Sequence, residues 1–189
     1  MIKKNYQRRH LRAPYKEPIL YADGAHVHVA TGLNISEGGL LLDKLPNFPD
    51  SDEVPLMFCV PQLPLFKDHG LLQMQGFSKD ELTYHVVRVK ARMVRREQLS
   101  QSLDNLFRSR FGLEFIRITA TDQKHIDNFI VSFCANLVHL QTLIDSFNKD
   151  EETKLRVRVL ALILGYAYTE KIAHLRNLVV EDYRNLQWL

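Results

Sequence analysis

The strongest constraint on the fold is the run "YHVVRVKARMVRRE" at residues 84–97, in which apolar and basic side chains alternate. Its apolar members include Val87, Val89, Ala91 and Met93, and Arg88, Lys90 and Arg92 stand between them. A strand turns successive side chains to opposite faces, so this period of two residues fits a strand and not a helix. The run therefore predicts a half-buried strand of an antiparallel sheet, with the basic side chains on the other face.

Other segments before residue 119 also have the composition of short strands separated by turns. They are "EPILYADGAHVHVATGL" (17–33), which fits a hairpin with Asp23-Gly24 at its turn, "GLLLD" (39–43), "EVPLMFCVP" (53–61) and "SRFGLEFIRI" (109–118). Several short strands with turn signals between them predict a small barrel or sandwich. Of the two longer connections, residues 61–82 are apolar enough that we expect them to pack against another part of the chain. The polar residues 98–109 are predicted to form a mobile hairpin tip.

Beyond Thr119 the pattern becomes helical. Thr119 can cap a helix, with Asp122 three residues further on, and apolar residues then recur at spacings of four and three. They are Ile126, Ile130, Phe133, Leu137, Leu140, Ile144 and Phe147. Such a seam predicts a helix that packs against other helices.

A polar break at residues 148–152 precedes a second predicted helix, which runs from about residue 151 towards residue 188. Its middle, "VLALILGYAY" (159–168), is apolar on every side, and this predicts burial all round. A small barrel cannot surround a helix in this way, so we expect another copy of the chain to cover it. The C-terminal helices are therefore predicted to make the protein a homo-oligomer. Packing of the helices onto the barrel of the same chain is the alternative.

The composition excludes several classes of protein. The formal net charge of +3 is too small for a general nucleic-acid coat. The basic N-terminus is not followed by the apolar stretch that a signal peptide needs. The longest apolar run is far shorter than the ~20 residues of a membrane helix. We therefore expect a cytoplasmic chain without membrane insertion.

The cysteines and histidines predict neither a disulfide nor a metal site. Cys59 and Cys134 form no CxxC pair, so we expect buried, inert thiols and not a disulfide framework or a zinc site. His26 and His28 share one face of a predicted strand, but no third ligand is evident in the sequence. No metal and no other cofactor is predicted.

Two short polar motifs stand on this β-strand background. Basic residues crowd the first sixteen positions, and Arg8 and Arg12 are four apart in "RRHLR". Arginine offers a planar fork of donors that fits a phosphate or the O6/N7 edge of guanine, and its flat face stacks on purine rings. The second motif, "NISEGG" (34–39), is rich in residues that form turns. Taken singly, the first motif fits a solvated tail and the second a β-turn without a ligand.

Together and in this order, the two motifs resemble those of the PilZ domain family, which are RxxxR and then [D/N]xSxxG. In this chain they are Arg8-Arg9-His10-Leu11-Arg12 and Asn34-Ile35-Ser36-Glu37-Gly38-Gly39. Downstream, "VRVKARMVRRE" is similar to the family's central strand of basic and apolar residues, and "RFGLEFIRI" to its late "GxxF" strand. The resemblance covers roughly residues 6–133.

The resemblance implies a six-stranded antiparallel β-barrel, which together with the basic N-terminal arm would occupy residues 1–120. The helical pattern described above adds a two-helix C-terminal extension at residues 121–189, the expected oligomerisation element. It also implies a receptor for cyclic di-GMP, a bacterial second messenger. Arg8, Arg9 and Arg12 would then bind guanine edges and phosphates from the arm. The facing lip of the barrel would consist of Asn34, Ser36, Gly38 and Gly39. Asn34 stands at the Asp-or-Asn position, where an amide accepts a hydrogen bond less strongly than a carboxylate does.

Two other interpretations stay open. A PilZ-fold module that binds no nucleotide would act through its helices on a downstream protein partner or on other copies of itself, although the intact motif arginines count against it. A nucleic-acid-binding barrel would use the paired arginines and the basic strand face, but its strands lack interleaved aromatic residues. Catalysis is not predicted, because Ser36 has no glycine-flanked nucleophile elbow and no convincing His or Asp partners.

Overall fold

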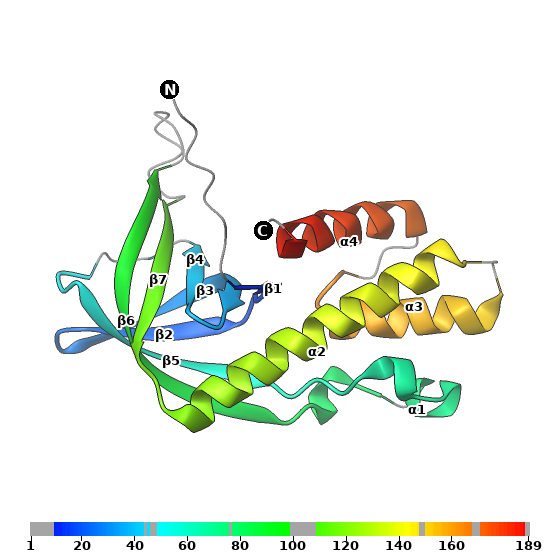
Figure 1. Ribbon diagram of the computed structural model, residues 1–189, viewed down its shortest axis with the longest axis horizontal. Coiled ribbons are helices and arrows are strands. Elements are labelled where there is room, and N and C mark those ends of the chain that lie inside the picture. The colour runs from blue at the N-terminus through cyan, green and yellow to red at the C-terminus, as the bar shows by residue number, and fades with distance from the viewer. Residues whose placement is uncertain are drawn as a thin grey trace. The chain divides into compact units, whose positions relative to one another are not determined.

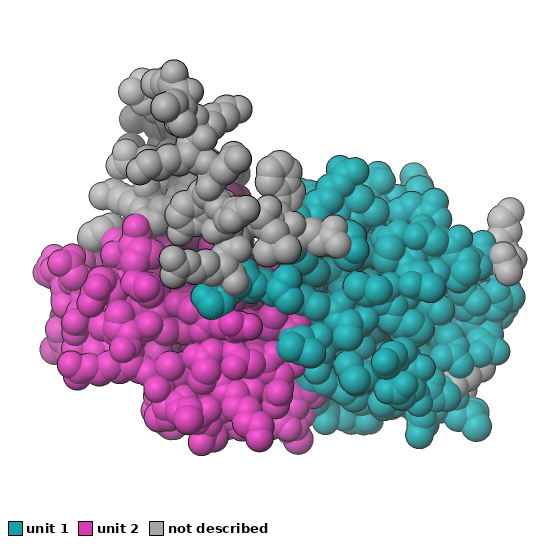
Figure 2. Space-filling model, in the orientation of Figure 1, with its two compact units in different colours: residues 1–11, 63–82, 131–189 teal, residues 12–62, 83–130 magenta. Residues whose placement is uncertain are grey.

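The computed structural model describes residues 10–43, 45, 49–75, 77–98, 109–147, 150–167 and 171–187. The chain divides into two compact units, which Figure 2 shows in different colours. The first, here called the barrel unit, comprises residues 12–62 and 83–130. The second, here called the helical unit, comprises residues 1–11, 63–82 and 131–189.

The barrel unit is a single antiparallel sheet of seven strands (Figure 1). They are β1 (Arg12–Pro14), β2 (Pro18–Asp23), β3 (His26–Ser36), β4 (Gly39–Asp43), β5 (Glu53–Pro61), β6 (Tyr84–Gln98) and β7 (Ser109–Arg117). Neighbouring strands follow the order β1-β3-β2-β5-β6-β7-β4, and β3 also pairs with β4. This additional pairing closes a six-stranded barrel and leaves β1 as an outside strand on β3. The predicted six-stranded antiparallel β-barrel is therefore confirmed.

The alternation that predicted the central strand is confirmed in β6. Val87, Val89 and Ala91 are buried, whereas Arg88 and Arg92 are exposed. The predicted hairpin is formed by β2 and β3, and the glycine at its turn has a φ of 56°, which suits a residue without a side chain. The other predicted strands form as β4, β5 and β7. Most of the predicted hairpin tip at residues 98–109 lies outside the described residues.

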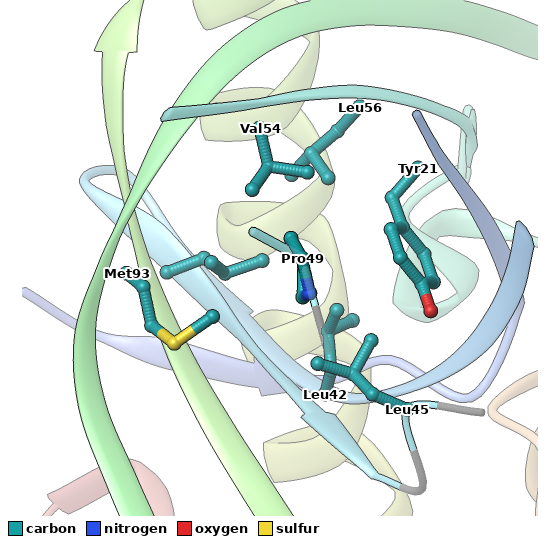
Figure 3. A pocket seen from close by; sticks show the side chains of 8 residues that line it. Tyr21, Leu42, Leu45, Pro49, Val54, Leu56 and Met93 are labelled. Carbon is teal, nitrogen blue, oxygen red and sulfur yellow. The ribbon is translucent and has the colours of Figure 1, made fainter. Parts of the chain in front are cut away.

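Apolar side chains fill the inside of the barrel. Figure 3 shows a group of them that point towards one another from several strands and from the connection between β4 and β5: Tyr21, Leu42, Leu45, Pro49, Val54, Leu56 and Met93. Leu113 of β7 lines the same space. The space between them is too small to hold a water molecule. A charged ligand would find no room among these side chains.

Tyr15 anchors the chain between β1 and β2. Its buried ring makes T-shaped contacts with Phe58 and Phe129, and its hydroxyl donates a hydrogen bond to the Cys59 carbonyl oxygen at 2.7 Å. Burial raises the pKa of the Tyr15 phenol well above its usual value. A Cβ atom on Gly32 would lie 2.5 Å from the Tyr15 ring, so the glycine leaves room for that ring.

The helical unit combines the segment between β5 and β6 with the C-terminal helices. The segment contains η1 (Phe66–Asp68), α1 (Leu71–Gln75) and η2 (Lys79–Glu81), and the helices are α2 (Ala120–Asp145), α3 (Glu151–Ile163) and α4 (Ile172–Gln187). The first turns of α2 belong to the barrel unit, and only its part from residue 131 onwards belongs to the helical unit. The compact units therefore have different bounds from the predicted domains, residues 1–120 and 121–189.

The segment between β5 and β6 packs against the helices, as its apolar composition predicted. Phe66 and Met74 are fully buried. The buried side chain of Asn136, in α2, donates a hydrogen bond to the Pro64 carbonyl oxygen at 2.8 Å and accepts one from the Phe66 N–H at 3.0 Å. Arg156 of α3 donates to the carbonyl oxygen of residue 69 at 3.2 Å, which ties the same segment to α3.

Helix α2 begins as predicted, and most of its apolar seam is buried. The Asp122 N–H donates to the Thr119 hydroxyl oxygen at 3.1 Å, which caps the first turn. The buried members of the seam are Ile126, Ile130, Phe133, Leu137, Leu140 and Ile144. Phe147 lies beyond the end of the helix and is half-buried. Among the described helices, none is long and apolar enough to cross a membrane.

The prediction of one helix from residue 151 towards residue 188 is wrong, because the chain forms α3 and α4 there. Gly165 has a φ of 84°, in the left-handed region. Its N–H donates to the Leu162 carbonyl oxygen at 3.0 Å, and the Tyr166 N–H donates to the Ala161 carbonyl oxygen at 2.9 Å. These two bonds form a Schellman motif, which ends a helix at a glycine.

The apolar middle of α3 is largely covered within the chain itself. Its buried residues are Val157, Leu160, Ala161 and Ile163, and Leu164 just beyond the helix is buried too. Leu162 is 56% exposed. Because the segment between β5 and β6 packs on α3, this burial does not require another copy of the chain.

The prediction of two buried thiols is wrong for Cys59. This residue is exposed, because it stands on the outer face of β5 between the buried Phe58 and Val60. Cys134 is partly exposed on α2, and burial of its thiol raises the pKa to about 11. The Cys134 thiol is therefore protonated and weakly nucleophilic at neutral pH.

Candidate ligand site

The end of the first motif, Arg12, meets the second motif on the outer wall of the barrel, where β1 pairs with β3. Arg12 of β1 stands opposite Ser36 of β3, and Pro14 stands opposite Asn34. Ile35 lies between the two polar motif residues and is fully buried, so Asn34 and Ser36 face outwards. The pairing thus brings the last arginine of the first motif beside the polar side chains of the second.

The first motif is only partly described. Arg12 is half-buried on β1, close in sequence to the buried anchor Tyr15. Because Tyr15 is buried and bonded to the Cys59 carbonyl oxygen, and β1 pairs with β3, the backbone at Arg12 has a defined place beside β3. Arg8 and Arg9, the other predicted ligand contacts of this motif, lie outside the described residues.

The second motif ends in the turn between β3 and β4, and the barrel holds this turn by its carbonyl oxygens. The Gly38 carbonyl oxygen accepts a hydrogen bond from the Phe115 N–H at 2.9 Å. The Gly39 carbonyl oxygen accepts one from the Ser36 hydroxyl at 3.2 Å. The Ser36 side chain therefore braces the turn, while its oxygen keeps the capacity to accept a further hydrogen bond.

A third bond to the turn comes from α2. Nε2 of Gln123 donates to the Glu37 carbonyl oxygen at 3.0 Å, across 86 positions of sequence. Sequence reasoning missed Gln123, because nothing in its local pattern separates it from any polar residue on the first turn of a helix. Gln123 reaches the turn only because the first turn of α2 packs against the barrel there.

Gly39 is needed for the packing of the barrel itself. The residue is buried, and a Cβ atom built on it would lie 2.1 Å from the Leu113 carbonyl oxygen of β7. Any side chain would push β4 away from β7. Gly38 is half-buried in the turn, so it is the more accessible of the two glycines.

The amino end of α2 is fastened to the barrel beside this site. His85 of β6 bonds through Nε2 to Oδ1 of Asp122 at 2.7 Å, and its ring stacks on that of His125 with the centroids 3.7 Å apart. Burial acts to raise the pKa of Asp122, but hydrogen bonds from His85 and Thr119 outweigh it, and the pKa is lowered. The carboxylate is thus ionised at neutral pH and holds α2 in place.

The described residues contain no group of three or more His, Cys, Asp or Glu side chains that could hold a metal ion. His26 and His28, the pair considered from the sequence, have ring centroids 6.3 Å apart. His28 instead lies against the ring of Tyr21, with the centroids 5.1 Å apart.

These features define a small closed β-barrel that carries Arg12, Asn34 and Ser36 beside one another on its outer wall. The sequence pattern of the PilZ domain family matches residues 6–132, and the chain belongs to this family. Comparison with curated protein sequences gives no significant match.

Several solved structures have a similar fold. The Bacillus subtilis inhibitor of motility MotI/DgrA is 17% identical, with 69% of this chain and 50% of that chain covered and a TM-score of 0.46. This chain therefore spans half the length of that protein. The PilZ domain of YcgR from Escherichia coli, solved with c-di-GMP, is 12% identical, with coverages of 67% and 90% and a TM-score of 0.41. The K. pneumonia MrkH–c-di-GMP complex is 15% identical, with coverages of 76% and 55% and a TM-score of 0.37.

Proposed function

We propose that this chain is a non-catalytic, nucleotide-binding receptor for cyclic di-GMP, which acts in the bacterial cytoplasm as an effector of second-messenger signalling. Its membership of the PilZ family supports the proposal. The observation that carries it is the pairing of Arg12 with Ser36, which sets a cation of one motif beside the polar lip of the other. The proposal involves no cofactor and no metal.

Each motif residue has a role in this proposal. Arg8, Arg9 and Arg12 bind guanine edges and phosphates through charge-assisted, forked hydrogen bonds. The lip consists of Asn34, Ser36, Gly38 and Gly39. Asn34 accepts from N1–H or N2–H of one guanine, Ser36 offers its hydroxyl oxygen, and Gly39 keeps the turn close to β7.

Calorimetric titration of the full chain with cyclic di-GMP, cyclic di-AMP and GTP tests the proposal. Adenine lacks the O6 acceptor to which an arginine fork donates, and it lacks the N1–H and N2–H groups from which Asn34 accepts. GTP has only one guanine. Cyclic di-GMP is therefore expected to bind at least tenfold more tightly than the other two, a difference of about 1.4 kcal/mol. Absence of cyclic di-GMP binding, or equal binding of all three nucleotides, would contradict it.

A second candidate function is a PilZ-fold interaction module that binds no nucleotide. Val131 and Val138, one heptad apart on α2, are 62% and 48% exposed, and Leu162 of α3 is 56% exposed. Exposed apolar side chains of this kind favour an assembly through the C-terminal helices, with other copies or with a downstream protein partner. The same titration separates the two candidates, because the module would leave cyclic di-GMP unbound.

A further inference from the structure

One side chain outside both motifs holds the turn of the candidate site. Gln123, in the first turn of α2, donates from Nε2 to the Glu37 carbonyl oxygen at 3.0 Å and to Oδ1 of Asp127 at 2.7 Å. Glu37 is exposed and Gly38 is half-buried, so the peptide between them lies at the surface. All four residues belong to the barrel unit, so the arrangement does not depend on the helical unit.

This hydrogen bond determines the direction of the Glu37–Gly38 peptide. The described chain has no cis peptide bonds, so the carbonyl oxygen and the N–H of this peptide point in opposite directions. Because the oxygen points to Gln123, the Gly38 N–H points away from it. Within the described part of the chain, the Gly38 N–H has no acceptor.

A backbone N–H of this kind is suited to an anionic ligand. Backbone N–H groups in turns take part in anion-binding concavities, and hydrogen bonds to a charged acceptor are stronger than neutral ones. The turn follows Ser36 directly, and Ser36 is paired with Arg12. The Gly38 N–H and a cationic side chain therefore stand beside the same stretch of β3.

We infer that Gln123 is a positioning residue of the ligand site: it holds the Glu37–Gly38 peptide so that the Gly38 N–H donates to a phosphate oxygen of the cyclic dinucleotide. The inference rests on the proposed function and deepens it. It adds a backbone donor, the Gly38 N–H, to the side chains of the two motifs. Gln123 of α2 sets the orientation of this donor. Binding is reciprocal, so a phosphate on the Gly38 N–H also favours the peptide orientation that Gln123 bonds.

Gln123→Met tests the inference, because methionine has nearly the same length as glutamine but no donor and no charge. Gln141→Met is the matched control. Gln141 also lies on α2 and donates to the carboxylate four residues further on, Asp145, at 2.8 Å, but it belongs to the helical unit. Both variants lose the same kind of pair within the helix, whereas only Gln123→Met loses a bond to the turn.

Two measurements on the full chain are required. In calorimetric titration with cyclic di-GMP, Gln123→Met is expected to bind about three- to tenfold more weakly than wild type, the fold-change of one net hydrogen bond, and Gln141→Met as tightly as wild type. In amide NMR spectra, cyclic di-GMP should move the Gly38 proton downfield in the wild type and clearly less in Gln123→Met. A loss of helix stability alone would not change that resonance.

The outcomes separate this inference from the proposed function. If the wild type binds cyclic di-GMP and Gln123→Met binds equally well, or if the Gly38 proton does not move in the wild type, the inference is overturned and the proposed function stands. If the wild type does not bind cyclic di-GMP at all, the proposed function fails and the inference fails with it.

Discussion

Gly39 belongs to the second sequence motif, but the packing of the barrel also requires a glycine at this position. Its replacement by alanine would place Cβ 2.1 Å from the Leu113 carbonyl oxygen, which is backbone and cannot rotate away. We expect Gly39→Ala to lower the free energy of unfolding by roughly 1–3 kcal/mol, the usual cost of overpacking, in the absence of any ligand. Urea unfolding followed by circular dichroism measures this change.

Gly70→Ala is the matched control for Gly39→Ala. The nearest atom to a Cβ on Gly70 is the flexible end of Gln73, 3.9 Å away, so this variant should be as stable as the wild type. If Gly39→Ala were equally stable, the close approach of β4 and β7 would be refuted.

Asp122 gives the barrel unit a defined dependence on pH. Its pKa is lowered in the folded chain, because hydrogen bonds from His85 and Thr119 outweigh the effect of burial. Such a carboxylate contributes stability above its unfolded pKa of about 3.9, and this contribution is lost as the pH falls through the lower, folded pKa. Between pH 6 and pH 3, the free energy of unfolding should fall more steeply for the wild type than for Asp122→Asn. Parallel curves from urea unfolding would show that the carboxylate contributes nothing.

At the scale of whole elements, the strands could be predicted because their signal is local. Alternation in β6 and the Asp23-Gly24 turn each depend on residues that are close in sequence. The boundary between α3 and α4 could not be read in this way, because Gly165 stands inside a continuous apolar run. A lone glycine is tolerated within helices, and only its left-handed φ and the bond from Tyr166 show that it ends one.

The same distinction applies to the candidate site. Arg12, Asn34 and Ser36 could be proposed from sequence because their spacing forms two recognisable motifs, and the register of β1 with β3 brings them together. Gln123 could not be proposed from the sequence, because its hydrogen bond to the turn depends on how the first turn of α2 packs against the barrel. Their roles in ligand binding stay predictions.

Asn136 ties the segment between β5 and β6 to α2, and its removal should destabilise the helical unit. Asn136→Ala leaves the Phe66 N–H and the Pro64 carbonyl oxygen without their partner. Each unsatisfied buried group costs roughly 1–3 kcal/mol, so we expect a loss of at least about 1 kcal/mol in the free energy of unfolding. Asn128→Ala, at an exposed position of the same helix, should cause a much smaller loss. Equal losses in thermal or urea unfolding would contradict the role given to Asn136.

At the scale of the whole molecule, the bounds of the two units could not be predicted from the order of the sequence. Residues 63–82 interrupt the barrel strands but belong to the helical unit. Their apolar composition indicated that they pack against something, and the partner became clear only from the bonds of Asn136 and Arg156. Residues 63–82 therefore stand between barrel strands in the sequence, although they group with the C-terminal helices in the structure.

The exposed apolar residues of the helices lead to a prediction about assembly. Val131, Val138 and Leu162 are each roughly half exposed or more, so we expect the full chain to form a dimer or a larger assembly, with or without ligand. Burying one such side chain contributes about 1.5–3 kcal/mol, so the double variant Val131→Asp with Val138→Asp should dissociate. Light scattering at micromolar concentration measures the oligomeric state of the wild type and of the double variant. A monomeric wild type would contradict the prediction.

Arg12 and the turn between β3 and β4 are expected to form one binding site, and titration of Arg12→Ala with cyclic di-GMP measures whether they do. The loss of hydrogen bonds to a charged group costs about 1.5–3 kcal/mol, so the affinity should fall roughly tenfold or more. Arg88→Ala is the matched control, because Arg88 is an exposed arginine on β6, outside the two motifs. Arg12→Ala should lose much of the affinity and Arg88→Ala little of it, with both variants folded by circular dichroism. Wild-type affinity in Arg12→Ala, or an equal loss in both variants, would contradict this expectation.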